Sequence, residues 1–285
     1  MKTEIIGLAK KEKISDIGFC SAERYLEKAA TSPAGACFCS SENMESLMDG
    51  AKTVIVCAFS YFSGAEKGNI SRYAQGLDYH TVARNKMSAI VDFLVKQGYS
   101  GMAFADNGPL NERLLATLSG LAFIGKNHMA INERLGSYFF IGYIITDCEL
   151  APDEENRLRC ADCGECIRVC PMKALCEETF KEEKCLSYVT QKKGELKKEE
   201  QDAIIKANSM WGCDMCQEVC PHNRVIKITE IDEFKNDLIV NLKLGDDLSN
   251  KDFKRLYNDR AFAWRGKNVL IRNQNVIYNG KKNEK

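Results

Sequence analysis

The sequence lacks any apolar run long enough to cross a membrane. Its longest, SYFFIGYII at 137–145, has fewer than half of the roughly 20 residues that a membrane helix needs. The first residues, MKTEIIGLAKKEK, interrupt every apolar run with a charge, so no secretory signal sequence is expected there. We therefore expect a cytoplasmic protein with no membrane partner.

The chain also lacks an excess of charge of either sign. Its 40 Lys and Arg balance 40 Asp and Glu, so no overall field attracts it to nucleic acid. Residues 251–285 differ, because ten Lys and Arg there stand against three Asp and Glu, a net charge of +7. A phosphate-binding surface requires such an asymmetry, although a solvated basic tail has the same composition. The candidate nucleic-acid contacts are Arg265, Lys267 and Arg272.

Common cofactor fingerprints are missing as well. The chain has no G-x-G-x-x-G dinucleotide motif, no G-x-x-x-x-G-K-[ST] phosphate loop and no H-E-x-x-H zinc motif. Cysteine, in contrast, is abundant: nine of the fourteen cysteines lie from Cys160 to Cys220. In a reducing compartment, cysteines concentrated in this way indicate metal ligands rather than disulfides.

The densest cysteine run is CADCGECIRVCP at 160–171, which has the C-x2-C-x2-C-x3-C-P spacing of bacterial ferredoxins. A second run, CDMCQEVCP, has Met210 where the first run has its leading cysteine, so Cys185 is the candidate to complete it. In two-cluster ferredoxins each run lends its last cysteine to the other cluster. This predicts two 4Fe–4S clusters, one held by Cys160, Cys163, Cys166 and Cys220, and the other by Cys170, Cys185, Cys213 and Cys216.

A pair of structural zinc sites is the alternative interpretation, because C-x2-C pairs also bind zinc. Two runs that both close with Cys-Pro, and that together supply seven thiolates, favour clusters. Such clusters move electrons one at a time. The cysteines therefore predict electron transfer without identifying the acceptor.

The whole chain divides by composition into three parts. Helical spacing alternates with β-branched and aromatic runs over 1–150, with strands expected at 53–62, 101–106 and 137–146. We expect an α+β fold: an α/β-like sheet domain with an inserted bacterial-ferredoxin-like two-cluster module and a short helical C-terminal stub. The expected parts are a catalytic domain at 1–150, the double 4Fe–4S module at 151–225 and a helical, basic segment at 226–285.

Three polar motifs stand out in the first part: SRYAQGLDYH at 71–80, FADNGPLNER at 104–113 and GLAFIGKNHM at 120–129. Each has an ordinary interpretation when taken alone. Asp106, at the end of a strand, could start an Asx-turn or cap the following helix. His80 and His128 could be surface or packed histidines.

Together with CLSYVT and WGCDMCQEVCPHN, these motifs resemble the epoxyqueuosine reductase family, whose cobalamin- and iron–sulfur-dependent enzymes complete the queuosine base in tRNA. The resemblance runs in order from about residue 1 to 225 and indicates a short form with a truncated C-terminal helical-repeat region. It implies an oxidoreductase that reduces the epoxide of epoxyqueuosine in tRNA to queuosine, with two 4Fe–4S clusters and cobalamin as cofactors.

The resemblance also implies roles for individual residues. Asp106 matches the proton donor beside the cobalt, and Cys185 matches the isolated cluster ligand. We further expect tRNA as a partner, an external electron donor such as flavodoxin or ferredoxin, and a monomer. The other residues implied to contact the corrinoid, or to lie between it and the clusters, are Tyr73, Asp78, Tyr79, His80, Lys126, Asn127, His128, Ser187 and Asp214.

Other functions remain open at this stage. The same corrinoid chemistry could act on another small substrate, as in reductive dehalogenases. Alternatively, the chain could be a non-catalytic iron–sulfur electron-transfer protein, or a cluster-carrying RNA-binding protein. A bound corrinoid separates the first alternative from the other two.

Overall fold

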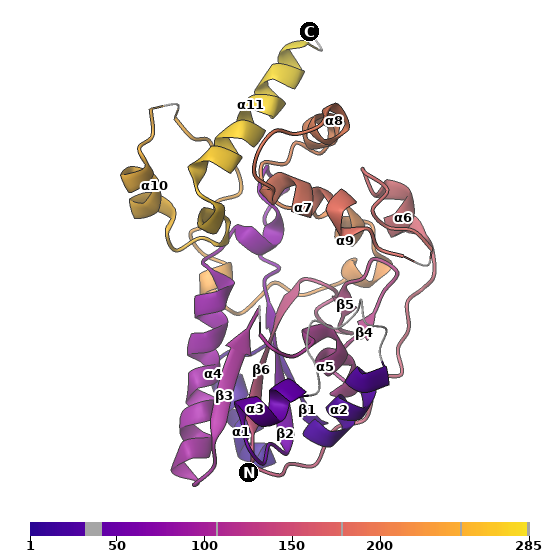
Figure 1. The fold of residues 1–285 in the computed structure, drawn as a ribbon, viewed down its shortest axis with the longest axis vertical. Coiled ribbons are helices and arrows are strands. Elements are labelled where there is room, and N and C mark those ends of the chain that lie inside the picture. Colours follow the sequence, from indigo (N-terminus) through magenta and orange to yellow (C-terminus); the bar gives the residue numbers. More distant parts are fainter. Residues whose placement is uncertain (32–41, 107, 178, 246, 284–285) are drawn as a thin grey trace.

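The computed structural model describes residues 1–31, 42–106, 108–177, 179–245 and 247–283. Its centre is a four-stranded sheet in the order β1-β2-β6-β3, in which every pair of neighbours is antiparallel (Figure 1). The strands are β1 (Asp16–Ser21), β2 (Thr53–Ser60), β3 (Gly101–Ala105) and β6 (Phe139–Thr146). The three strands expected from sequence are therefore present, and β1 is an additional one.

The register of the sheet brings three chain segments together at one end of its strands, which is called the sheet edge below. Ser60 at the end of β2 pairs with Phe139 at the start of β6, and Ala105 at the end of β3 pairs with Gly142. Tyr61 and Asp106, which follow directly after β2 and β3, consequently lie at this edge beside the first residues of β6. This is the edge that faces the cysteine-rich part of the chain (Figure 1).

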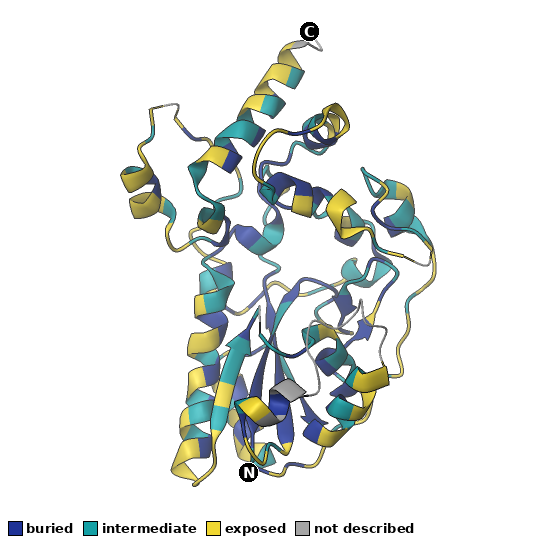
Figure 2. Ribbon diagram, viewed as in Figure 1, coloured by how far each residue is buried: buried dark blue, intermediate teal, exposed yellow. Residues whose placement is uncertain are grey.

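Helices cover both faces of the sheet. The side chains of β2 alternate between two cores: Ile55, Cys57 and Phe59 join the first, while Val54, Val56 and Ala58 join the second. All eight residues of this strand are buried, as an apolar strand between two helical layers should be (Figure 2). The first core includes α1 (Lys2–Lys11) and α4 (Tyr79–Lys96), and the second α2 (Ala22–Thr31), α3 (Glu42–Leu47) and α5 (Glu112–Leu118).

A third core holds the helices beyond the sheet edge. Trp211 and Phe262 are buried at its centre, together with Ile70 from the first part of the chain. Its helices include α7 (Leu186–Gln191), α8 (Lys198–Ala207), α10 (Asn250–Tyr257) and α11 (Lys267–Asn283). The helical character expected beyond 226 is thus present in α10 and α11.

Short elements complete the fold. Near the cysteine runs lie α6 (Glu165–Val169) and α9 (Met215–Glu218), and a small two-stranded sheet is formed by β4 (Phe123–Ile124) and β5 (Ala130–Ile131). The 3-10 turns are η1 (Arg72–Ala74), η2 (Glu182–Lys184), η3 (Pro221–Asn223), η4 (Asp232–Phe234) and η5 (Ala261–Arg265). Within the described residues, none of the helices combines the length and the apolar character needed to span a bilayer.

Candidate functional site

The site lies where the sheet edge meets the cysteine-rich segment, and side-chain amides hold this junction together. Asn223 Oδ1 accepts the Ser137 N–H at 2.7 Å, and its Nδ2 donates to Ser137 Oγ at 2.8 Å. Gln217 Nε2 donates to the Ser137 carbonyl at 2.9 Å. Gly136 has a φ of +59°, and a Cβ there would lie 2.0 Å from Asn223 Oδ1, so only glycine allows this approach. The segment that follows the second cysteine run is therefore fixed to the start of β6.

The structure brings the eight predicted cysteine ligands together in two groups. Cys160, Cys163, Cys166 and Cys220 line one cavity, together with Lys126, Asn127 and His222. Cys170, Cys185, Cys213 and Cys216 line a second cavity of about 320 Å³. These are the same two sets of four that the exchange of last cysteines between runs predicts.

The second group is close enough for its members to interact electrostatically. Burial raises the pKa of the Cys216 thiol, and the charges of Cys213, Cys185 and Cys170 raise it further. Among the described residues, no three His, Cys, Asp or Glu are arranged to hold one metal ion. A cubane is larger than one ion, and its four irons hold their thiolates farther apart.

The second cavity has walls suited to a flat apolar group. Its lining is mostly aromatic and aliphatic, including Tyr61, Tyr73, Tyr79 and Phe140. Asn127 also lines it, is only 5% exposed, and has an amide Nδ2 with no hydrogen-bond partner among the described residues. A buried amide without a partner is costly unless a bound group satisfies it. The lining therefore fits an apolar group that offers an acceptor to Asn127.

Asp106 joins this cavity through Tyr79. The Tyr79 hydroxyl donates to Asp106 Oδ2 at 2.5 Å, and His80 Nε2 lies 3.1 Å from the same oxygen. His80 Nδ1 lies 2.7 Å from Asp78 Oδ1, and Asp78 also caps α4 by accepting the His80 N–H. The helix N-terminus thus orients His80 and Tyr79 toward Asp106, so that the DYH motif and the strand end form one network.

This network shifts the proton affinities of its members. Its hydrogen bonds to Asp106 and Asp78 raise the pKa of His80 to about 9. Burial, and then the charge of Asp106, raises the pKa of Tyr79 well above its usual range. His80 is therefore protonated at neutral pH and Tyr79 keeps its hydroxyl proton, so both donate to Asp106.

Glu112 belongs to the network but was not singled out from the sequence. The backbone N–H of Asp106, a residue with a φ of +53°, donates to Glu112 Oε1 at 2.9 Å. Burial, and then the charge of Asp106, raises the pKa of Glu112 to about 8. Its position at the start of the helix that was expected after Asp106 was the available signal, because Glu112 is the first residue of α5. The helix-cap interpretation of Asp106 is wrong, because Asn111 caps α5 by accepting the Leu114 N–H.

The remaining predicted site residues fall in different places. Ser187 and Tyr73 line the second cavity, whereas Lys126 lies in the first and pairs with Asp162 and Glu177. The ring of His128 packs against Phe180, and Asp214 accepts hydrogen bonds from Ser71 Oγ and the Arg72 N–H. Cofactor contacts by Lys126, His128 and Asp214 stay predictions.

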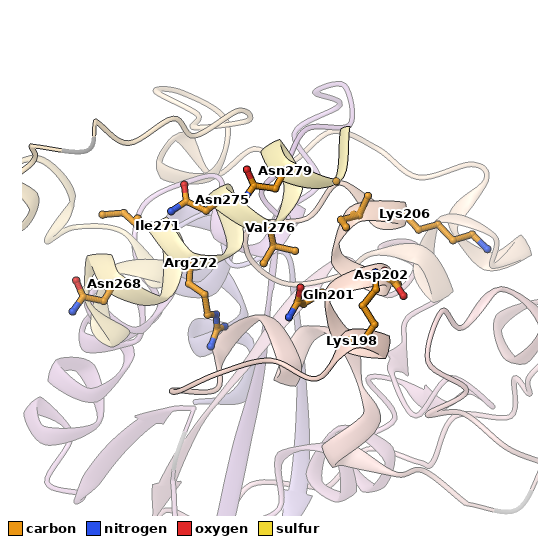
Figure 3. A pocket seen from close by; sticks show the side chains of 12 residues that line it. Lys198, Gln201, Asp202, Lys206, Asn268, Ile271, Arg272, Asn275, Val276 and Asn279 are labelled. Carbon is orange, nitrogen blue, oxygen red and sulfur yellow. Dashed lines mark hydrogen bonds and ion pairs between the residues drawn. The ribbon is translucent and has the colours of Figure 1, made fainter. Parts of the chain in front are cut away.

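The three basic residues proposed from charge differ in their surroundings. Lys267 Nζ donates to the Leu248 carbonyl. Arg272 Nη1 donates to the Lys192 carbonyl and to the Gly194 carbonyl, at 2.7 Å in both cases. Arg272 extends from α11 beside a groove of about 1010 Å³ that α8 lines on the other side (Figure 3). These two residues therefore hold neighbouring chain segments together, whereas the guanidinium of Arg265 lies over the Trp264 ring, 3.8 Å from its centroid.

Two family models match the parts that form this site. Residues 159–223 match a 4Fe–4S double cluster binding domain, and residues 42–107 match the model described as "Epoxyqueuosine reductase QueG, DUF1730". One of the two cysteine groups lines a cavity that the acid–base network also reaches. Together with these matches, the two groups define the class of the protein. It is an iron–sulfur oxidoreductase with two 4Fe–4S clusters.

Comparison with individual proteins gives the family. The chain is 32% identical over 304 residues to the epoxyqueuosine reductase of Lactococcus garvieae, covering 98% of this chain and 86% of that one. The structure of epoxyqueuosine reductase from Streptococcus thermophilus is similar with 31% identity and a TM-score of 0.82, covering 97% of this chain and 80% of that chain. The chain belongs to the epoxyqueuosine reductase family. An epoxyqueuosine reductase solved with an epoxyqueuosine-modified tRNA-Tyr stem loop has 27% identity and a TM-score of 0.83, over 97% of this chain and 80% of that one.

Proposed function

We propose that this protein reduces the epoxide of epoxyqueuosine in tRNA to queuosine. One observation carries the proposal: four cysteines and Tyr79 line the same cavity, and the Tyr79 hydroxyl is hydrogen-bonded to Asp106. An electron source and a proton source therefore meet at one place, as a reductive ring opening requires. Membership in the epoxyqueuosine reductase family supports this substrate.

Each group of four cysteines would hold one 4Fe–4S cluster, and cobalamin would bind beside the second group, against the other walls of the second cavity. Asn127 and Ser187 supply polar contacts to it, and Tyr61, Tyr73, Tyr79 and Phe140 supply apolar ones. When bound, the clusters deliver electrons singly and the corrinoid supplies reductive attack on an electrophilic carbon. The clusters and this cavity are adjacent, since Cys170, Cys185, Cys213 and Cys216 line the cavity itself.

The protein contributes position and a proton. Asp106 takes a proton from protonated His80 and passes it to the oxygen that is released when the epoxide opens, which leaves His80 neutral. The whole reaction consumes two electrons and two protons and releases the epoxide oxygen as water. The Tyr79 hydroxyl and the Glu112 carboxyl fix the orientation of Asp106, one through its side chain and the other through its N–H. A general acid placed in this way typically contributes about 10²- to 10⁴-fold to the rate.

The remaining parts of the proposal concern partners. The RNA substrate binds on the side of the second cavity, and an external one-electron donor such as flavodoxin or ferredoxin approaches the first cluster, where Cys163 is exposed. The chain acts as a monomer.

Replacing Asp106 by Asn tests the proposal directly. Anaerobically reconstituted Asp106→Asn protein should keep both clusters and bind cobalamin as the parent does, while queuosine formation in an epoxyqueuosine-containing tRNA stem loop falls by at least about 10²-fold. Mass analysis of the digested nucleosides measures the product. Unchanged turnover would contradict the assigned role of Asp106.

The same assay separates the alternative substrate class. If the parent protein binds cobalamin and dehalogenates a small haloaromatic substrate, but leaves epoxyqueuosine in RNA untouched, the chain is a corrinoid reductase of small molecules. If it binds clusters and no cobalamin, it is an electron-transfer protein.

A further inference from the structure

His222 has no role in the proposed function, yet it lines the cavity of the first cysteine group together with the four cysteines. The residue is only partly buried, but its Nε2 atom is buried and has no hydrogen-bond partner among the described residues. A buried nitrogen without a partner costs free energy unless a bound group satisfies it. Whatever fills this cavity is therefore expected to offer an acceptor to His222 Nε2.

The fold holds His222 in place beside the cavity. It lies in the 3-10 turn η3, between the predicted ligand Cys220 and Asn223, whose side-chain amide is bonded to Ser137. The imidazole packs edge-on against the buried ring of Phe123, with the ring centroids 5.2 Å apart and the planes at 70°. The side chain is thus oriented in advance, and little conformational entropy is lost when Nε2 gains a partner.

His222 is the donor that belongs to this cavity alone. Asn127 Nδ2 is also buried without a partner among the described residues, but Asn127 lines the second cavity as well, where the proposed cofactor offers it an acceptor. Lys126 lines the first cavity, and its ammonium already pairs with Asp162 and Glu177. His222 Nε2 is therefore the side-chain donor in the first cavity that still needs an acceptor of its own.

A 4Fe–4S cluster supplies such an acceptor. Its bridging sulfides and its thiolates carry negative charge, and hydrogen bonds to these sulfurs are among the factors that set its reduction potential. The turn already directs one donor at a ligand. Burial raises the pKa of the Cys220 thiol, and a hydrogen bond from the His222 backbone opposes that rise. The His222 side chain adds a second donor from the same residue.

We propose that the His222 imidazole donates a hydrogen bond from Nε2 to a sulfur of the first cluster and thereby raises the reduction potential of that cluster. A neutral imidazole with its proton on Nε2 is sufficient for this bond. His222 is not an iron ligand, because the four cysteines of the first group already provide one thiolate for each iron. The bond favours the reduced cluster, which carries one more negative charge.

The step that this bond affects is the transfer of one electron. The external one-electron donor is oxidised, the first cluster is reduced, and the imidazole keeps its proton. A higher potential makes this step more favourable and makes the onward step to the second cluster less so, so His222 sets the balance between the two. The inference goes beyond the proposed function, because it depends on the cysteine partition and holds for any substrate.

The first test detects the bond itself. Holoenzyme that carries ¹⁵N-labelled histidine, reduced stepwise with dithionite, should show a weak ¹⁵N coupling to a reduced cluster in pulsed EPR spectra. The chain has three histidines, and His80 and His128 line neither cysteine cavity. The coupling should therefore disappear in His222→Phe, which keeps an aromatic ring against Phe123 and removes the donor.

The second test measures the potential by EPR-monitored redox titration. His222→Phe should lower the potential of the first cluster by about 59 mV, the equivalent of a roughly tenfold change in the equilibrium constant for one electron. The signal of the first cluster is identified from Cys185→Ala, in which the first group alone keeps all four cysteines. His222→Gln should keep most of the potential, because its amide still donates.

His128→Phe is the matched control. The His128 ring packs against Phe180, outside the first cavity, so the same substitution there should leave the coupling and the first-cluster potential unchanged. The second cluster in each sample is an internal control, and its potential should stay constant in His222→Phe.

A parent spectrum without histidine coupling would overturn the proposal, as would an unchanged first-cluster potential in His222→Phe. If His222→Phe does not hold the first cluster, the parent coupling decides: a weak coupling supports the hydrogen bond, and one as strong as that of a directly ligated nitrogen overturns it. These outcomes leave the proposed function standing, because queuosine formation in RNA is measured separately. A parent that holds fewer than two clusters would overturn the cysteine partition together with this inference.

Discussion

The proton network around Asp106 illustrates how neighbours set the chemistry of one residue. His80 donates to Asp106 on one side and to Asp78 on the other, and these bonds hold its pKa near 9. Glu112, buried against the Asp106 backbone, has its pKa raised to about 8. At neutral pH both groups carry protons that surround Asp106, and both lose them in mildly alkaline solution.

This gives a prediction for the pH dependence of turnover. In the proposed mechanism His80 supplies the proton that Asp106 passes on, so kcat should fall as pH rises through about 9, when His80 becomes neutral. Glu112 ionises near 8, and its negative charge beside Asp106 then makes Asp106 a weaker proton donor, so the fall should begin below 9. Rapid-quench measurement of queuosine formation from pH 6 to 10 gives the profile, with cluster absorbance as the control for intact protein.

Variants assign the two groups in that profile. His80→Gln should lower kcat and remove the component near 9, whereas Glu112→Gln should remove only the earlier component, because the amide oxygen still accepts the Asp106 N–H. An unaltered alkaline limb in His80→Gln would exclude His80 as the source of that proton.

Cys185 is the residue on which the arrangement of the clusters depends. It lies between the two runs in sequence, yet it lines the same cavity as Cys170, Cys213 and Cys216. Anaerobically reconstituted Cys185→Ala should therefore retain about four of about eight irons, with the remaining cluster at the first cysteine group. Cys176→Ala, which removes a partly exposed cysteine outside both groups, is the control and should keep full iron content. Full retention in Cys185→Ala would disprove the partition.

At the scale of elements, α11 is attached to the cluster segment by one buried amide. Asn273 is 0% exposed, and its Nδ2 donates to the Thr190 carbonyl at 2.7 Å and to the Met210 carbonyl at 2.8 Å. Thr190 belongs to α7, and Met210 precedes the second cysteine run. This one buried side chain therefore joins α11 to both segments that carry Cys185 and Cys213, in addition to the Arg272 bonds to the Lys192 and Gly194 carbonyls.

Loss of this amide should be strongly destabilising. Asn273→Ala leaves two buried carbonyls without their donor, which costs about 2–4 kcal/mol. The apparent thermal midpoint of the holoprotein by circular dichroism should fall by about 5 °C or more. Asn279→Ala, on the exposed side of the same helix, should shift it by less than about 1 °C. Equal midpoints for the two variants would show that this contact is not needed.

At the scale of the whole molecule, the function depends on distant segments that converge at one sheet edge. Residues after β2 and β3, the start of β6 and both cysteine runs meet there, although they span positions 60 to 220 of the chain. Helices α10 and α11 lie beyond this edge (Figure 1). There they complete the third core, and η5 lines a cavity of about 910 Å³ that adjoins the second one. Among the basic C-terminal residues, Lys267 and Arg272 therefore attach neighbouring segments, while the Arg265 guanidinium lies over the Trp264 ring.

Spacing along the chain was enough to predict the features that depend on local order. The cysteine runs predicted two groups of four, and the apolar runs predicted β2, β3 and β6, because ligand spacing and strand alternation are local properties. The polar motif around Asp106 could also be recognised in the sequence, and the resemblance to the family assigned a role to it.

Only the folded chain could decide which residues meet across long separations. The antiparallel strand order and the short strand β1 depend on pairing, which a six-residue segment does not reveal by itself. In the sequence Glu112 is an ordinary first-turn helix glutamate, and only the fold places its carboxyl against the Asp106 N–H. A tryptophan is commonly a core residue, but η5 leaves Trp264 exposed at a cavity. Local charge likewise gave Lys267 and Arg272 as candidate RNA contacts, and only the tertiary structure shows that both side chains donate to backbone carbonyls of other segments. Their contact with RNA stays a prediction.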